Sequence, residues 1–106
     1  MNEYIRGASL PDWGVNWTTA DGTTIDFASG WTFEGRMVNS QTYVEAFTKT
    51  SGITGAATSP NVTVQWTVNE LDITPGEYVF YLEATQTSTS KKRVSNYDFR
   101  IVDPGP

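Results

Sequence analysis

Leu71-Asp72-Ile73-Thr74-Pro75-Gly76-Glu77-Tyr78 reads as a tight corner, and it leads straight into the alternating run Tyr78-Val79-Phe80-Tyr81-Leu82-Glu83-Ala84-Thr85. Pro75 fixes φ for the second position of a β-turn, and Gly76 tolerates a positive φ at the third. The even positions from Tyr78 to Ala84 are all apolar, which is the pattern of a strand with one buried face. We therefore predict that Pro75, Gly76 and Tyr78 form a structural corner of an all-β fold.

The same period of two recurs along most of the chain. It predicts strands over the ranges 13–18, 25–27, 31–37, 61–68 and 94–102. A further strand is expected over residues 41–50, with uncertain register because apolar and charged side chains share its faces. In that strand Tyr43 and Phe47 are expected on one face together with Glu45 and Lys49.

Turn-forming residues separate these segments. Asp21-Gly22 indicates a hairpin turn, and Asn39-Ser40 a second turn. The small residues of the range 51–60 predict a long loop, and the range 69–72 a single helical turn in which Leu71, with Ile73 after it, closes the end of the fold. Lys91-Lys92-Arg93, next to Thr87-Ser88-Thr89-Ser90, is expected at a solvated hairpin tip, with a docking contact as the alternative.

Composition limits the chemistry available. The chain has 106 residues, no Cys and no His, so disulfides, thiolate metal sites and the commonest general base are missing. Aromatic residues make up 13% of the chain, which supplies a core large enough for one domain. We predict one β-sandwich domain over residues 1–106, with a short N-terminal arm over about 1–10, and no cofactor.

Charge and hydropathy restrict the partners. The net charge is −5, which opposes attraction to nucleic acid or to an anionic membrane, so neither is expected as a partner. Met1-Asn2-Glu3-Tyr4-Ile5-Arg6 has no apolar segment of the kind found in signal peptides, and no window approaches the length of a membrane span. Asn16-Trp17-Thr18 and Asn61-Val62-Thr63 match the glycosylation tripeptide, a match that is common by chance.

About seven strands, regular turns and no βαβ alternation predict an antiparallel β-sandwich. The corner resembles that of immunoglobulin-like domains, in which the Tyr hydroxyl bonds back across the turn. Three segments in order, Arg6 to Pro11, Asp21 to Phe27 and Leu71 to Tyr78, resemble the small β-sandwich domains of tailed-bacteriophage virion proteins. Those relatives include the N-terminal domains of baseplate upper proteins and the sandwich domains of long tail fibre and head accessory proteins.

That resemblance implies a non-enzymatic structural protein of the virion, an adaptor in the tail, baseplate or capsid. It implies contacts with other virion proteins and with copies of itself. Tyr4 and Ile5 in the arm, with Tyr43 and Phe47 in the amphipathic strand, are the expected interface, and ordinary burial is the alternative for the two strand aromatics. The chain ends at Pro106 without a coiled coil or stalk, which puts receptor binding in doubt.

Catalysis, calcium binding and carbohydrate binding are the other functions that this sequence can be tested for. Glu34, Glu45, Glu83 and Asp98 fall on outward strand positions, so they favour a solvated face over catalysis, and no catalytic residue is predicted. Asp21, Thr23 and Asp26 could hold Ca²⁺, although the turn explains the same residues and no metal site is predicted. A carbohydrate-binding or adhesion module, with a host-surface glycan as ligand, needs exposed aromatic rings. Trp13, Trp17, Trp31 and Trp66 instead fall on apolar strand faces, which favours burial.

Overall fold

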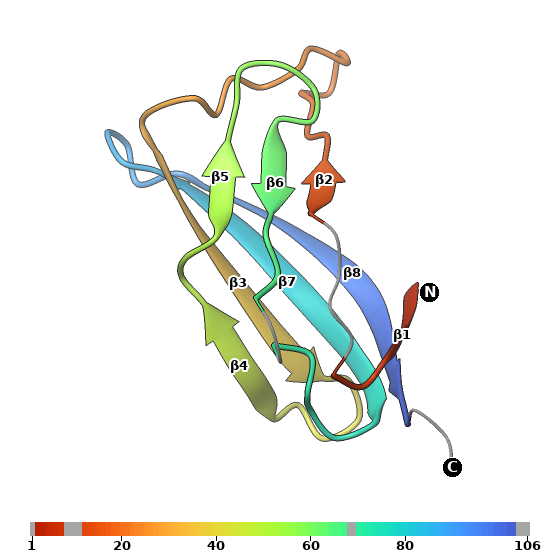
Figure 1. The fold of residues 1–106 in the computed structure, drawn as a ribbon. Coiled ribbons are helices and arrows are strands. Elements are labelled where there is room, and N and C mark those ends of the chain that lie inside the picture. The colour runs from red at the N-terminus through yellow and green to blue at the C-terminus, as the bar shows by residue number, and fades with distance from the viewer. Residues whose placement is uncertain (1, 8–11, 68–69, 104–106) are drawn as a thin grey trace.

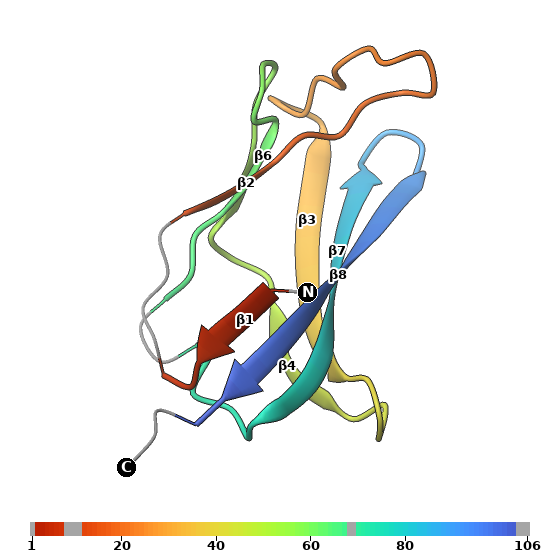
Figure 2. The ribbon, with the colours of Figure 1, turned by 90° about the vertical axis from the view of Figure 1, so that its right-hand side faces the viewer.

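The computed structural model of the protein describes residues 2–7, 12–67 and 70–103. Its strands form two sheets, one of five strands in the order β1-β8-β7-β3-β4 and one of three in the order β2-β6-β5. The smaller sheet lies over one face of the larger one (Figures 1 and 2). The bounds are β1 Asn2–Ile5, β2 Trp13–Val15, β3 Trp31–Asn39, β4 Glu45–Lys49, β5 Ile53–Gly55, β6 Val62–Val64, β7 Gly76–Gln86 and β8 Lys92–Val102. The all-β prediction is confirmed, with eight strands among the described residues where about seven were expected.

The three long strands β3, β7 and β8 form the centre of the larger sheet. β7 pairs antiparallel with β3 on one side and β8 on the other. Tyr78, Phe80, Leu82 and Ala84 are buried and their neighbours are partly exposed, as the alternation predicts. Opposite residues in an antiparallel pair point to the same face of the sheet. The residues of β3 and β8 that pair with the buried positions of β7 therefore also face the core.

Within the described part of the predicted N-terminal arm, Asn2–Ile5 form the strand β1. β1 pairs in parallel with the end of β8, from Asn2 opposite Phe99 to Ile5 opposite Val102, so the sheet is not purely antiparallel. The Tyr4 ring packs 5.1 Å from the Phe99 ring, and burial raises the pKa of the Tyr4 hydroxyl. Residues 8–10 of the predicted arm lie outside the described residues.

The smaller sheet differs from prediction in two places. The range 51–60 contains β5, which pairs antiparallel with β6, so a long loop there is wrong. The strand predicted over 61–68 is limited to Val62–Val64. Trp66 lies beyond its end but still packs against the core. Val68 and Asn69 lie outside the described residues; Glu70 and Leu71 form a turn, and Leu71 is buried as expected.

The segment between β2 and β3 has almost no strand pairing. The predicted strand at 25–27 is replaced by a single bridge between Thr18 and Thr24. The turn at Asp21-Gly22 is confirmed, since the Gly22 N–H donates to the Thr19 carbonyl at 2.9 Å. The Asp21 carboxylate accepts hydrogen bonds from the Thr19 hydroxyl and the Thr23 N–H. These bonds, the Thr19 one first, lower the pKa of the Asp21 carboxyl.

Asn61 replaces the backbone pairing that this segment lacks. Its side chain is fully buried. The Asn61 Oδ1 accepts from the Trp17 N–H at 2.8 Å. Its Nδ2 donates to the Trp17 carbonyl at 2.7 Å and to the Ile25 carbonyl at 2.9 Å. Buried backbone groups need such partners, so this one carboxamide holds the 17–25 segment against β6.

A cluster of aromatic rings lies in the core between the sheets. Phe80 and Phe99 are buried, with ring centroids 5.9 Å apart, and Trp66 and Trp13 pack on both. All four Trp side chains are partly buried and pack against the core, as predicted. Gly35 makes room for this arrangement, because a Cβ there would lie 2.4 Å from Cζ of Phe80.

We predict that Phe80→Ala and Phe99→Ala each lower the free energy of unfolding by ~3 to 5 kcal/mol, because each leaves a cavity in a packed core. Trp66→Ala is expected to cost less, because the Trp66 ring is only partly buried. Urea denaturation of the purified variants measures this. A loss below about 1 kcal/mol for both Phe variants would show that the two sheets do not pack as described.

The predicted corner is present. The Tyr78 hydroxyl donates to the Thr74 carbonyl at 2.5 Å, four residues back along the chain. Gly76 has φ of +157°, a conformation that residues with a Cβ rarely adopt. The chain therefore turns at Pro75, Gly76 and Tyr78, where it passes from the segment after β6 into β7.

Tyr78→Phe removes this hydrogen bond and keeps the buried ring, so we expect a loss of ~0.5 to 1.5 kcal/mol with the fold intact. Gly76→Ala is expected to cost more because of its φ. Unfolding free energies of the two variants and of the parent test this. Equal stability of all three proteins would show that the corner contributes nothing.

Candidate interaction surface

The approach to β4 exposes apolar side chains at an edge of the larger sheet. The strand predicted over 41–50 is shortened to Glu45–Lys49 because the turn at Asn39-Ser40 extends through Thr42. Tyr43 follows with φ of +59° and 82% exposure, and Val44 is 64% exposed. A positive φ is uncommon for a residue with a side chain, so this turn presents Tyr43 to solvent from a constrained backbone.

Tyr43 and Phe47 therefore do not share one face, contrary to the prediction. Met37 pairs with Phe47 and Val38 with Glu45, so one extra residue, Ala46, interrupts the register of β4. Phe47 packs against the core, whereas Tyr43 points away from it. Burial was the alternative prediction for the two aromatic side chains. The Phe47 ring follows it, because Phe47 is partly buried against the core.

β4 is held in place by an ion pair that the sequence-based prediction missed. The Lys49 side chain is only 2% exposed, and its Nζ contacts Oε1 and Oε2 of Glu70 at 2.9 and 3.0 Å. Oε1 also accepts from the Thr67 N–H at 3.0 Å. Lys49 is two residues after Phe47, so both side chains lie on the same face of the strand. A charged residue on the face that carries the partly buried Phe47 is the feature of the sequence that indicates a buried ion pair.

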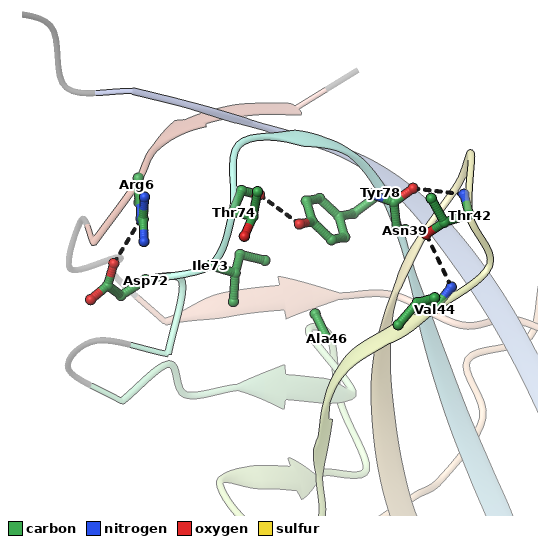
Figure 3. Close-up of a pocket in the computed structure, with 9 residues that line it drawn as sticks. All are labelled: Arg6, Asn39, Thr42, Val44, Ala46, Asp72, Ile73, Thr74 and Tyr78. Carbon is green, nitrogen blue, oxygen red and sulfur yellow. Dashed lines mark hydrogen bonds and ion pairs between the residues drawn. The ribbon is translucent and has the colours of Figure 1, made fainter.

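An open cavity of about 490 Å³ lies between β4 and the segment before β7. Figure 3 shows Val44 and Ala46 on one side of it, Ile73 and Thr74 on the other, and the Tyr78 ring between them. Arg6 and Asp72 border it as an ion pair of 2.9 Å with both side chains about half exposed. The lining of the cavity is therefore mixed, with apolar groups from Val44, Ala46, Ile73 and Tyr78 and polar groups from Arg6, Asn39, Thr42, Asp72 and Thr74.

The predicted interface residues are split between two edges. Tyr43 lies beside β4 and Ile5 on β1, and these strands are the opposite edges of the larger sheet. Ile5 is 52% exposed, whereas Tyr4 packs inward. We define the edge surface as Val44, Ala46 and Ile73, which line the cavity, together with the exposed Tyr43 that precedes Val44 in the chain.

Three of the acidic side chains bind groups that lie close to them in the structure. Glu77 binds Arg100 at 2.8 Å and Glu83 binds Lys92 at 3.2 Å across neighbouring strands. Asp26, considered for a calcium site, accepts the Ala28 N–H at 2.9 Å. Among residues 2–7, 12–67 and 70–103 there is no group of three or more acidic side chains placed to hold a metal ion.

The same ranges contain no helix long and apolar enough to cross a membrane. Comparison with known proteins found no matching family, no similar curated protein and no similar solved structure. The functional argument therefore depends on the edge surface itself.

Removing one partner of the buried ion pair leaves the other charge without compensation, so Glu70→Ala should lower the free energy of unfolding by about 3 to 5 kcal/mol. Asp72→Ala is the matched control, because its pair with Arg6 is exposed and is worth at most about 1 kcal/mol. Urea denaturation compares the two variants. Equal losses would contradict a structural role for Lys49 and Glu70.

Proposed function

We propose that this protein is a non-enzymatic structural subunit of a tailed-bacteriophage particle, an immunoglobulin-like adaptor in the tail, baseplate or capsid. It acts through contacts with other virion proteins and with copies of itself. The observation that carries the proposal is the edge surface, where Tyr43 and Val44 are largely exposed and Val44 lines an open cavity together with Ala46 and Ile73. Exposed apolar groups gathered at one place mark interaction sites more often than isolated ones do.

The shape of this surface suits the addition of a partner strand. β4 is an edge strand, so one row of its backbone N–H and C=O groups lacks a strand partner, and these groups can pair with an added strand. Its position is fixed by the Lys49–Glu70 pair, so little ordering is needed on binding. An apolar side chain of the partner would enter the cavity, while Tyr43 covers the added strand.

The immunoglobulin-like assignment is supported by two local features. One is the hydrogen bond from the Tyr78 hydroxyl to the Thr74 carbonyl, which closes the corner as in that class of domain. The other is the facing of two sheets across an aromatic core. The virion assignment adds the resemblance of the three ordered segments to phage sandwich domains.

The test replaces the edge surface and leaves the core alone. Tyr43→Ser with Val44→Ser should abolish incorporation into particles of the phage that encodes the protein, with the unfolding free energy changed by less than about 0.5 kcal/mol. Val94→Ser is the control, because Val94 is 58% exposed but lies on β8. Phe47 is left unchanged since it packs against the core.

Particles are purified and the protein is quantified in them by mass spectrometry, alongside circular dichroism of the free variants. Normal incorporation of the double variant would reject the edge surface as the contact. Absence of the parent protein from purified particles would reject the virion assignment itself.

A further inference from the structure

Within the described part of the chain, the side chains of Lys91 and Arg93 at the β7–β8 hairpin form no ion pair. The chain has seven Lys and Arg residues, and all of them are described. Arg6, Lys49, Lys92 and Arg100 form ion pairs, and Arg36 lies over the Tyr81 ring at 5.9 Å. Lys91 and Arg93 are exposed and form no ion pair within the described part of the chain.

The register of the β7–β8 hairpin places these two cations on the core-facing side of the larger sheet. Arg93 pairs with the buried Ala84, so the two side chains point to the same face. Lys91 is two residues earlier, and its carbonyl accepts the Gln86 N–H at 2.8 Å. Lys92 points to the opposite face, where its ammonium binds Glu83.

An indole lies on the same side. Trp31 is directly opposite Gln86 in the β3–β7 pairing and is partly exposed. A cavity of about 380 Å³ is bordered by Trp31, Gln86 and the three basic residues. A second one of about 210 Å³ is also bordered by Arg93, together with Asn16, Trp17, Thr18, Val94 and Ser95. Arg93 thus borders two hollows, each with a Trp side chain in its wall.

The electrostatics of both hollows favour an anion. No carboxylate borders either cavity among the described residues, although the chain as a whole carries a net charge of −5. Screening confines the repulsion from distant acidic groups to about 10 Å or less at physiological salt, so the local positive charge dominates there. Arg in particular binds a carboxylate through two parallel hydrogen bonds.

The hollows are also preformed. The Thr87 N–H and hydroxyl both bond to the Gly30 carbonyl, at 2.9 and 3.1 Å, which ties the hairpin to the start of β3. The Trp31 ring is fixed by an edge contact with Phe27, 4.8 Å between centroids. The hairpin and the beginning of β3 lie at the same end of the molecule in Figures 1 and 2. The backbone of the hairpin and the Trp31 indole are therefore held in place before a ligand arrives, which limits the conformational entropy lost on binding to the two exposed cation side chains.

We infer that this hairpin groove, Trp31, Gln86, Lys91, Arg93 and Trp17, binds an acidic saccharide through its carboxylates and sugar rings. The C–H face of a pyranose stacks on an indole, a polar-rimmed aromatic surface, and the carboxylate of a uronic acid reaches Arg93 or Lys91. Two hollows that share one Arg in their linings suit two consecutive sugar units. The inference goes beyond the structural role proposed above and does not depend on it, because the groove lies at the other end of the larger sheet from the edge surface.

The probe is tetragalacturonate, and its fully methyl-esterified form is the matched control ligand with the same rings and no charge. Isothermal titration calorimetry and NMR titration of the Trp indole N–H signals measure binding to the free protein. We expect the acid to bind, the ester to bind at least about tenfold more weakly, and the shifts to be confined to Trp31 and Trp17.

Arg93→Gln is expected to weaken binding of tetragalacturonate by about tenfold or more, and Lys91→Gln to have a similar effect. Arg36→Gln is the matched control, because it makes the same change of charge on the opposite face of the sheet, and it should leave affinity within about twofold. All three positions are exposed, so the variants are expected to fold.

Any one of four results would overturn the inference. The first three are no binding of tetragalacturonate by the parent protein, equal affinity for the ester, and equal weakening by Arg36→Gln and Arg93→Gln. Competition by a polyglutamate peptide of equal charge, with equal affinity, would show that the groove recognises acidic protein segments and would overturn the saccharide assignment. Particle incorporation is unaffected by any of these outcomes, so the two proposals fail separately.

Discussion

The buried carboxamide of Asn61 is the interaction on which the placement of the smaller sheet depends. A segment with only one β-bridge leaves polar backbone groups near the core, and an unpaired buried group costs about 1 to 3 kcal/mol. Asn61 bonds to three backbone groups, the Trp17 N–H and the carbonyls of Trp17 and Ile25, and the Trp17 carbonyl also accepts the Ile25 N–H. Because the Trp17 backbone is fixed, its indole Nε1 can donate to the Tyr97 hydroxyl on β8 at 3.1 Å, which links the segment to the larger sheet. The Asn61 side chain therefore helps to position the 17–25 segment relative to both sheets.

The same bonds decide what Asn61 cannot do. It belongs to a glycosylation tripeptide by sequence, but its nitrogen already donates to two carbonyls and the residue is fully buried. Attachment of a sugar to the folded protein would break these bonds. Asn16, in the other tripeptide, is exposed and binds the Ser59 hydroxyl at 2.5 Å. Both tripeptides match the glycosylation pattern equally well in the sequence, but the structure shows that Asn61 is buried and Asn16 is exposed.

The sequence predicts those parts of the fold that local rules determine. Pro75, Gly76 and Tyr78 carry their own turn chemistry, and Phe80 to Ala84 carry a strict alternation, so the corner and β7 are recovered. Pairing between distant segments is not local. Nothing in Asn2 to Ile5 shows that they join β8 in parallel, and Ala46 carries no sign of interrupting the register of β4. The edge surface was found only in part, because Tyr43 was assigned to a regular strand that begins two residues later. The Lys49–Glu70 pair spans 21 residues and needed the tertiary structure.

The parallel pairing of β1 with β8 has a consequence for the order of folding. These strands are separated by nearly the whole chain, whereas β7 and β8 are joined by a short hairpin. Contacts between distant segments carry the larger loop-closure cost and tend to form after local ones. The docking of Tyr4 on Phe99 is therefore expected after the rate-limiting step, once the hairpin exists. A strand that docks so late leaves the refolding rate unchanged and prolongs the lifetime of the native state, because it must detach before the sheet can open.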